Sequence, residues 1–469
     1  MNHDAEPNGN SNMKDLLKAA AVRAVHYLET LDERGVAPAP AAIQGLARFD
    51  EKLPDGPSDP AATLALLDEA GSPATMASTG GRFYGWVTGG SLPATVAANW
   101  LAGAWDQNAA GWPGSPTTAT IEEVALRWLV ELLGLPKGTG AGFVTGATMA
   151  NFSCLAAARH AVLKAAGWDV AADGMFGASP ITVVVGDEVH VAVLKALSLL
   201  GLGQKRVLRV PVDDQGRMRA DRFPSLSGPA IVCLQAGNVN TGAFDPIAEL
   251  CESAHAAGAW VHVDGAFGLW AAATPERAHL VAGIDRADSW ATDGHKWLNV
   301  PYDCGLAFVR DAAPLRAAMA VSAAYLSVAD QRKPNDFTPE MSRRARGVEV
   351  WAALHSLGRS GLAEMFERNC RQAARFAGGL RAAGYEVLNE VVLNQVLVSF
   401  GDAATTRRVI AGIQSDGTCW CGGTEWQGRT AMRISVSSWA TTDSDVEKSL
   451  AAMLRVAAAV RAEQAAPVA

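Results

Sequence analysis

Short runs of apolar and β-branched residues alternate with longer helical patterns through the middle of the chain. The runs lie at 181–187, 206–212, 230–237, 259–265, 288–293 and 304–309. Several of them are apolar on both faces, as strands that are covered by helices on each side must be. The pattern therefore predicts an α/β domain with a mostly parallel central sheet.

The two ends of the chain follow different patterns. Apolar residues recur at helical spacing from about Met13 to Leu31, which predicts an N-terminal helix. Beyond about residue 346, two helical stretches precede strand-like runs and a last helix, an order typical of an α+β domain. We predict an N-terminal helical segment over 1–79, a large α/β domain over 80–345 and a small C-terminal α+β domain over 346–469.

Composition narrows the class of partner. The chain has 469 residues, of which 40 are basic and 48 acidic, and its formal net charge is −8. No basic run interleaved with aromatic residues is present, which argues against nucleic acid as a partner. No apolar stretch reaches the roughly 18 residues of a membrane span, and the polar N-terminus does not look like a signal peptide. We expect a soluble, cytoplasmic protein that has no membrane partner.

Seven cysteines are scattered without the spacing of metal ligands. An odd number of cysteines without metal-ligand spacing is typical of thiols that serve as small buried side chains in a reducing compartment. The sequence therefore predicts no metal site.

Two stretches suggest a ligand site, the first for an anion and the second through a histidine. An apolar run ends at Thr145 and Gly146 and a helix follows at once, so its free N–H groups and the Thr148 hydroxyl suit a phosphate. The same stretch is also an ordinary helix start. His190 lies just beyond a strand, where ligands gather in open α/β sheets, although a histidine there can be purely structural.

Asp264 and Lys296 add groups of opposite charge. Asp264 ends a buried strand, and it could meet a bound cation, cap a helix or form a loop ion pair. Lys296 lies in a tight loop after another buried strand, and a desolvated lysine is the nucleophile that Schiff-base chemistry requires. An anion site, an imidazole, a buried carboxylate and a nucleophilic lysine are together the groups that hold pyridoxal 5′-phosphate.

Five motifs carry a resemblance to a known family. They are "HVDGAFG" at 262–268, "GHKWLNVPYDCG" at 294–305, "SPTTATIEE" at 115–123, "AGNVNTGAFDPI" at 236–247 and "SRRARGVEVWAAL" at 342–354. Together they closely resemble the group II pyridoxal-phosphate-dependent amino acid decarboxylases, which include the aromatic-L-amino-acid, tyrosine, histidine and glutamate decarboxylases. The likeness runs from about Gly81 to Leu454 and implies a fold-type I (aspartate aminotransferase-like) large domain and a homodimer.

The resemblance also implies roles for particular residues. Lys296 forms the Schiff base with the cofactor, Asp264 pairs with the pyridine nitrogen, and His190 and Ala266 lie against the two faces of the ring. The phosphate-binding positions are Ala147, Thr148, Asp293 and His295. Asp293 stands where aromatic-acid members carry a neutral Asn, so its own contact with a phosphate is in doubt. The substrate positions are Trp86, Thr88, Trp112 and Arg433, although the two tryptophans could equally belong to the core.

These roles imply decarboxylation of an L-amino acid, with an aromatic or other apolar side chain slightly favoured. One departure from the family opens alternatives: the loop at 326–344 lacks the usual proton-donating tyrosine, and Phe337 is its only aromatic residue. The nearest tyrosines are Tyr302 and Tyr325. Oxidative deamination, aldol cleavage and transamination with the same cofactor therefore stay open. A non-catalytic binding protein that has kept the fold also stays open. A nucleotide-binding dehydrogenase is disfavoured, because the sequence has no Gly-x-Gly-x-x-Gly turn that opens a helix after the first strand.

Overall fold

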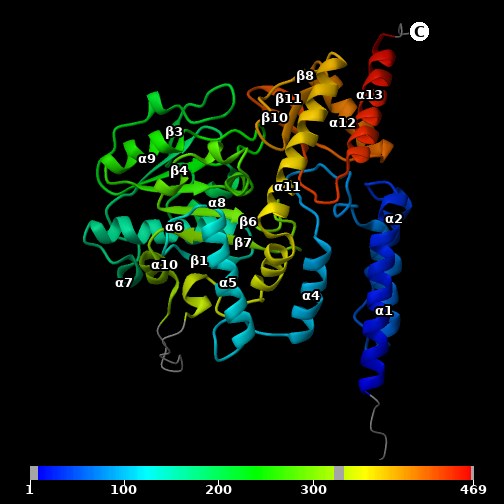
Figure 1. The fold of residues 1–469 in the computed structure, drawn as a ribbon, viewed down its shortest axis with the longest axis horizontal. Coiled ribbons are helices and arrows are strands. Elements are labelled where there is room, and N and C mark those ends of the chain that lie inside the picture. The colour runs from blue at the N-terminus through cyan, green and yellow to red at the C-terminus, as the bar shows by residue number, and fades with distance from the viewer. Residues whose placement is uncertain (1–8, 322–331, 466–469) are drawn as a thin grey trace, which may run out of the picture.

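Residues 9–321 and 332–465 are described in the computed structural model of the chain, which contains two sheets (Figure 1). The larger sheet has seven strands in the order β1-β7-β6-β5-β4-β2-β3. Its strands are β1 (Gly140–Val144), β2 (Thr182–Gly186), β3 (Leu208–Val210), β4 (Ala230–Gln235), β5 (Trp260–Asp264), β6 (Ser289–Asp293) and β7 (Gly305–Val309). Only β7 runs against its two neighbours, which confirms the mostly parallel α/β sheet.

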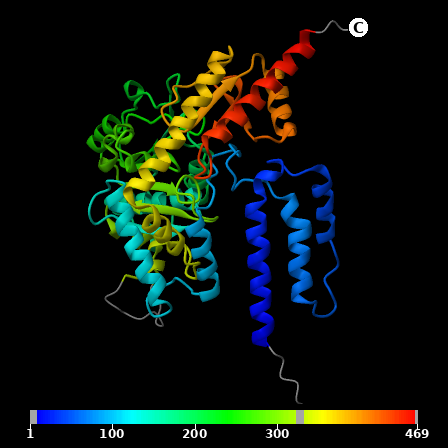
Figure 2. The ribbon, with the colours of Figure 1, turned by 45° about the vertical axis from the view of Figure 1, so that its right-hand side comes forward.

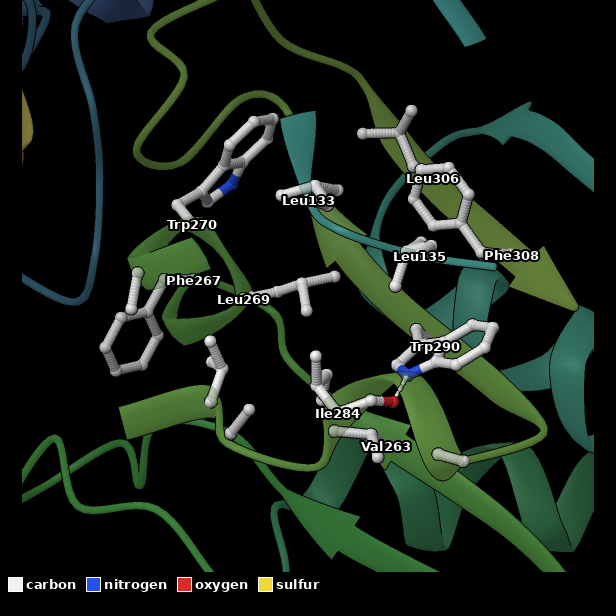
Figure 3. Packing of buried hydrophobic residues seen from close by; sticks show 14 of the residues in the cluster. Leu133, Leu135, Val263, Phe267, Leu269, Trp270, Ile284, Trp290, Leu306 and Phe308 are labelled. Carbon is white, nitrogen blue, oxygen red and sulfur yellow. Dashed lines mark hydrogen bonds between the residues drawn. The ribbon is translucent and has the colours of Figure 1, made fainter. Parts of the chain in front are cut away.

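Helices cover both faces of this sheet. One face carries α6 (Ala147–Ala165), α8 (Val191–Leu199) and α10 (Ala312–Met319), and α7 (Val170–Asp173) follows α6. The other face packs against α5 (Pro116–Leu132), α9 (Ile247–Ala256) and the segment after β5. Figure 3 shows this second core, in which the buried Trp290 indole donates a hydrogen bond of 2.8 Å to the Ile284 carbonyl. Burial on both faces explains why the strands are apolar throughout.

The smaller sheet is antiparallel, with the order β10-β11-β9-β8. It is formed by β8 (Glu386–Val387), β9 (Gln395–Ser399), β10 (Gly422–Trp426) and β11 (Arg429–Ser435), with α12 (Ala403–Asp416) and α13 (Asp443–Ala465) packed beside it. The sequence reading missed β10 because its two glycines and exposed polar residues hide the strand pattern.

The segment α11 (Gly347–Ala382) connects the two sheets and consists of two helices that meet at a kink, in agreement with the two helical stretches that the sequence predicts. Its backbone leaves the helical region at Gly358, with φ 60° and ψ −175°. This break lies inside the predicted two-helix stretch. The domain boundaries at residues 79 and 345 stay a prediction.

The N-terminal helices stand apart from the rest of the chain, as Figure 2 shows most clearly. They are α1 (Gly9–Glu29), α2 (Pro40–Gly45) and α3 (Pro60–Leu66), and α4 (Pro93–Trp105) follows. Several apolar side chains on α1 are exposed, including Leu17 at 60% and Val22 at 69%. Within the described ranges, none of the helices combines the length and apolar character needed to span a membrane.

Candidate active site

Lys296 lies in the turn that follows β6, close to the carboxylate that ends this strand. Its Nζ atom is 3.0 Å from Oδ2 of Asp293, and the lysine side chain is 21% exposed. The other oxygen of Asp293 accepts a hydrogen bond of 2.6 Å from the backbone N–H of Ala147, the first residue of α6. Asp293 therefore connects the lysine to the start of α6.

The start of α6 brings together the predicted phosphate-binding positions. His295 Nε2 lies 3.5 Å from Asp293 Oδ1, and its Nδ1 accepts a hydrogen bond of 3.0 Å from the Cys304 N–H. Burial lowers the pKa of His295, so the ring is neutral near pH 7 and carries its proton on Nε2. Thr148 lies in the first turn of α6 and is half-buried.

β7 passes very close to the same helix start. A Cβ atom on Gly305 would lie 2.4 Å from the Gly146 backbone, so only glycine fits there. Because β7 lies against the backbone at Gly146, the donors that an anion can reach are the N–H groups of the first turn of α6.

Asp264 is buried at the C-terminal end of β5. Its carboxylate accepts one hydrogen bond from Asn151 Nδ2 and one from the Ala266 N–H, both of 3.1 Å. Across the described residues, no lysine, arginine or histidine lies within ion-pair distance of this carboxylate. A buried carboxylate without a cationic partner suits a cationic ligand.

A hydrogen-bonded chain extends from Asp264 into the protein. Asn151 Oδ1 accepts from His262 Nε2 at 2.7 Å, and His262 Nδ1 lies 2.9 Å from the Ser289 hydroxyl. Burial lowers the pKa of His262 to about 3, so the ring is neutral and every donor in the chain can point toward Asp264. Sequence reasoning missed Asn151 and His262, although His262 lies two residues before Asp264 and so shares its face of β5.

His190 and Arg433 complete the polar part of the site. His190 precedes α8, and its Nδ1 accepts a hydrogen bond of 3.2 Å from the Ala192 N–H. Burial lowers the pKa of His190, while the charge of Asp264 acts in the opposite direction. The charges of Lys296 and Arg433 also act on His190, so these predicted residues lie around one space.

Arg433 reaches this space from β11 of the smaller sheet. It donates a hydrogen bond of 3.5 Å to Asn240 Oδ1. Burial lowers its pKa to about 10, so the guanidinium stays charged near pH 7. No carboxylate of the described residues lies within ion-pair distance of Arg433, which leaves it available to an anionic group.

Comparison with known proteins now identifies the family. The profile of the pyridoxal-dependent decarboxylase conserved domain matches residues 74–401. The chain belongs to this family. Tryptophan decarboxylase 1 of Oryza sativa subsp. japonica is 29% identical over 76% of this chain and 76% of its own length. The 4-hydroxyphenylacetaldehyde synthase of Rhodiola rosea is 27% identical over 75% of this chain and 74% of its own length.

The fold is also that of solved family members. The crystal structure of Oryza sativa TDC with PLP and tryptamine matches with a TM-score of 0.89 and 22% identity, over 97% of this chain and 99% of that chain. The chain is therefore a pyridoxal-phosphate-dependent carboxy-lyase of fold-type I, and its cofactor is pyridoxal 5′-phosphate.

The described residues fit this decarboxylase cofactor. The unpartnered carboxylate of Asp264 suits the protonated ring nitrogen, and the Lys296 amine suits the aldehyde. The first turn of α6 with Thr148 and His295 suits the phosphate. Asp293 already accepts from the Ala147 N–H and pairs with Lys296, so we expect it to position the lysine rather than to contact a phosphate.

The segment 82–90 lies directly on the lysine turn. A Cβ atom on Gly89 would lie 1.9 Å from the Lys296 carbonyl oxygen. Trp86 is 60% exposed, and its ring lies 5.1 Å from the Trp420 ring. Gly89 therefore brings this segment to the lysine turn, and Trp86, three residues earlier, is its exposed aromatic side chain. Trp112 is 39% exposed and shares no ring contact with the aromatic residues that the structure describes, so it is not brought to this group.

Phe337 has a structural position. It is only 8% exposed, in a cluster with residues of β1 and α6, and the Arg332 guanidinium lies 4.5 Å from its ring centre. The sequence suggests that Phe337 could stand in for the missing loop tyrosine, but the packing instead makes it part of the core. Tyr325 lies outside the described residues.

Proposed function

We propose that this decarboxylase removes the α-carboxylate of an L-amino acid with an aromatic or other apolar side chain, releasing the amine and carbon dioxide. The observation that supports this most is the buried, hydrogen-bonded carboxylate of Asp264, which lacks a cationic partner among the described residues. The lysine amine lies in the same site.

The roles of the side chains follow from their chemistry. The bound cofactor supplies an aldehyde for the substrate amine and a ring that withdraws electrons from the bonds of Cα. Asp264 keeps a negative charge beside that ring, and the chain of donors from His262 through Asn151 stabilises this charge. Arg433 binds the substrate carboxylate, and His190 covers the reacting centre as a neutral imidazole. Ala266 would lie against the opposite face of the bound ring, as the family resemblance implies.

The aromatic residues support an apolar substrate side chain. Trp86, Phe83 and Trp420 form a connected group of rings, of which Trp86 is the exposed member. Such rings offer a large apolar surface to an aromatic or aliphatic group. Thr88, in the same segment, supplies a hydroxyl close to Tyr302. Trp112 stays a candidate from the sequence alone.

Oxidative deamination with the same cofactor is the second candidate. It is supported by the absence of a tyrosine from 326–344 of the sequence and by the likeness to a 4-hydroxyphenylacetaldehyde synthase. Phe337 is buried in the core and has no proton to donate, so it does not decide between the two candidates. Aldol cleavage and transamination stay as further outcomes.

The test is a product analysis of the purified, cofactor-loaded protein with each of the twenty amino acids. We expect carbon dioxide and amine in equal amounts from an aromatic or apolar substrate, and no turnover from Lys296→Ala. Aldehyde, ammonia and hydrogen peroxide in place of amine would favour the second candidate. Release of no carbon dioxide from any substrate would contradict the proposal.

We further propose that the chain forms a homodimer and works in the cytoplasm. The exposed apolar side chains of α1 support a second copy as its partner. All seven cysteines are free and buried, as is typical of a reducing compartment.

A further inference from the structure

The chain has five tyrosines, and their positions differ sharply. Tyr27 lies on α1, where its hydroxyl is 2.8 Å from that of Thr75. Tyr84 and Tyr385 are buried in the core of the small domain, and Tyr325 lies outside the described residues. Tyr302 is the tyrosine that the described ranges bring to the lysine turn.

The phenol ring of Tyr302 lies on the imidazole of His295. The two ring centres are 4.3 Å apart and their planes differ by 26°, so the rings are stacked. His295 is the neighbour of Lys296 in the chain and lies 3.5 Å from Asp293, the partner of the lysine. The stack therefore holds the phenol ring against the residue that precedes Lys296, and the charge of Lys296 acts on the phenol.

Contacts on the far side of Tyr302 fix its backbone. Its carbonyl accepts a hydrogen bond of 3.4 Å from Arg344. The next residue, Asp303, pairs with Arg346 at 3.0 Å and with Arg344 at 3.6 Å. The residue as a whole nevertheless remains 60% exposed, so its ring is not enclosed in the core.

We propose that Tyr302 is the acid that protonates the substrate carbon after carbon dioxide has left. This inference rests on the decarboxylation proposed above. When the bond between Cα and the carboxylate breaks, the electron pair remains on the substrate side and carbon dioxide departs. The Tyr302 O–H then gives its proton to Cα, the new C–H bond uses that electron pair, and the phenolate left behind takes a proton from water. No oxidant is consumed.

The protonation state of the phenol suits this role. Burial of its hydroxyl raises the pKa of Tyr302, while Thr88 and the charge of Lys296 act in the opposite direction. A phenol with a raised pKa carries its proton at neutral pH, as an acid must. Thr88 provides a hydrogen-bond partner that stabilises the phenolate after the transfer.

The decisive variant is Tyr302→Phe, which keeps the ring stack and removes only the hydroxyl. We expect carbon dioxide release to continue, the rate of amine formation to fall about 100-fold, and aldehyde with hydrogen peroxide to appear as oxygen takes the unprotonated electron pair. Tyr385→Phe, which removes a phenol hydroxyl from the small domain, is the matched control and should leave the products unchanged.

A second measurement does not depend on turnover. Ultraviolet titration of the cofactor-free protein, taken as wild type minus Tyr302→Phe, isolates the ionisation of this one phenol. We expect a pKa above the usual value of about 10, and a further rise in Thr88→Val because the partner of the phenolate is lost.

The outcomes separate the two proposals. A wild-type protein that releases no carbon dioxide contradicts the proposed function. A wild-type protein that decarboxylates while Tyr302→Phe keeps the same amine yield and rate contradicts the role of Tyr302 alone. Loss of amine in Tyr325→Phe but not in Tyr302→Phe would also overturn the assignment.

Discussion

His262 and Asp264 occupy alternate positions of β5, so both side chains point to the face of the sheet that α6 covers. His262 is completely buried, and its two ring nitrogens are used by Asn151 and Ser289. A neutral histidine is therefore part of the hydrogen-bonded chain that supports the Asp264 carboxylate. This has a consequence for stability in acid.

The unfolded chain takes up a proton on His262 near the ordinary pKa of 6.5, whereas the folded protein keeps this ring neutral down to about 3. At pH values above the unfolded-state pKa of 6.5, His262 does not make the free energy of unfolding depend on pH. As the pH falls below it, proton uptake favours the unfolded state by up to about 1.4 kcal/mol per pH unit. We therefore predict that His262→Gln flattens the loss of stability between about pH 6.5 and about pH 4.

The measurement is the midpoint of urea unfolding for both proteins at several pH values in this window. His26→Gln, at an exposed position on α1, serves as the control and should follow the wild type. Parallel pH profiles for wild type and His262→Gln would contradict the prediction.

At this scale the sequence predicts the residues whose chemistry is unusual for their surroundings. A lysine after a buried strand and an aspartate at a strand end are conspicuous in one dimension, and the structure brings Lys296, Asp293, His295 and Ala147 together. Asn151 carries no such signal, and the sequence marks Tyr302 only as one of two tyrosines near the loop that lacks one. Their positions depend on how α6 and the turn after β6 pack in space.

At the scale of elements, Asn299 joins three segments that are far apart in the chain. Its side-chain oxygen accepts from the Gly90 N–H at 2.8 Å and the Trp439 N–H at 2.9 Å. Its amide nitrogen donates to the carbonyls of Trp297 at 2.7 Å and Ser437 at 3.0 Å. The Asn299 side chain therefore connects the turn that carries Lys296 to the segment 82–90 and to the residues that follow β11.

Asn299→Gly tests this junction. Asn299 has φ 57°, in the left-handed region where glycine is tolerated, so the variant removes four hydrogen bonds without backbone strain. We predict a loss of about 3 kcal/mol in the free energy of unfolding, together with weaker retention of the cofactor. Urea unfolding and equilibrium dialysis of the cofactor are the measurements.

Asp106→Gly is the matched control, because Asp106 is an exposed residue with φ 47° at the end of α4. It should leave stability within about 0.5 kcal/mol of the wild type. Equal stability of Asn299→Gly and wild type would show that the junction is not needed.

The elements themselves are predictable to different degrees. Strands β2 and β4 consist almost entirely of buried apolar residues, so their positions follow from the apolar runs of the sequence. The exact place of the kink in α11 and strand β10 do not, because the helical pattern continues on both sides of Gly358 and β10 begins with two glycines and has exposed residues. Tertiary contacts decide both.

At the scale of the whole molecule, α1 stands apart from the rest of a single copy (Figure 2), and apolar side chains such as Leu17 and Val22 are exposed on it. A cavity of about 930 Å³ lies between α1, α3 and α4, and its walls include Tyr27, Leu28 and Trp100. An isolated chain therefore leaves a large apolar surface in contact with water. A second copy that covers it explains why these side chains are apolar.

We predict that the double variant Leu17→Glu and Val22→Glu is monomeric, because it places two charges on the exposed face of α1. Analytical ultracentrifugation of the wild type and the variant is the measurement, and the wild type should sediment as a dimer. Phe176→Glu, at a side chain that is 98% exposed outside this surface, is the control and should stay dimeric. A dimeric double variant would contradict the assignment.

The position of α1 also matters while the protein is being made. Because α1 precedes every strand in the chain, its apolar face leaves the ribosome before the sheet exists. During that interval the exposed face favours aggregation. Expression at high rates should therefore yield inclusion bodies, and the charged α1 variant should be recovered in the soluble fraction.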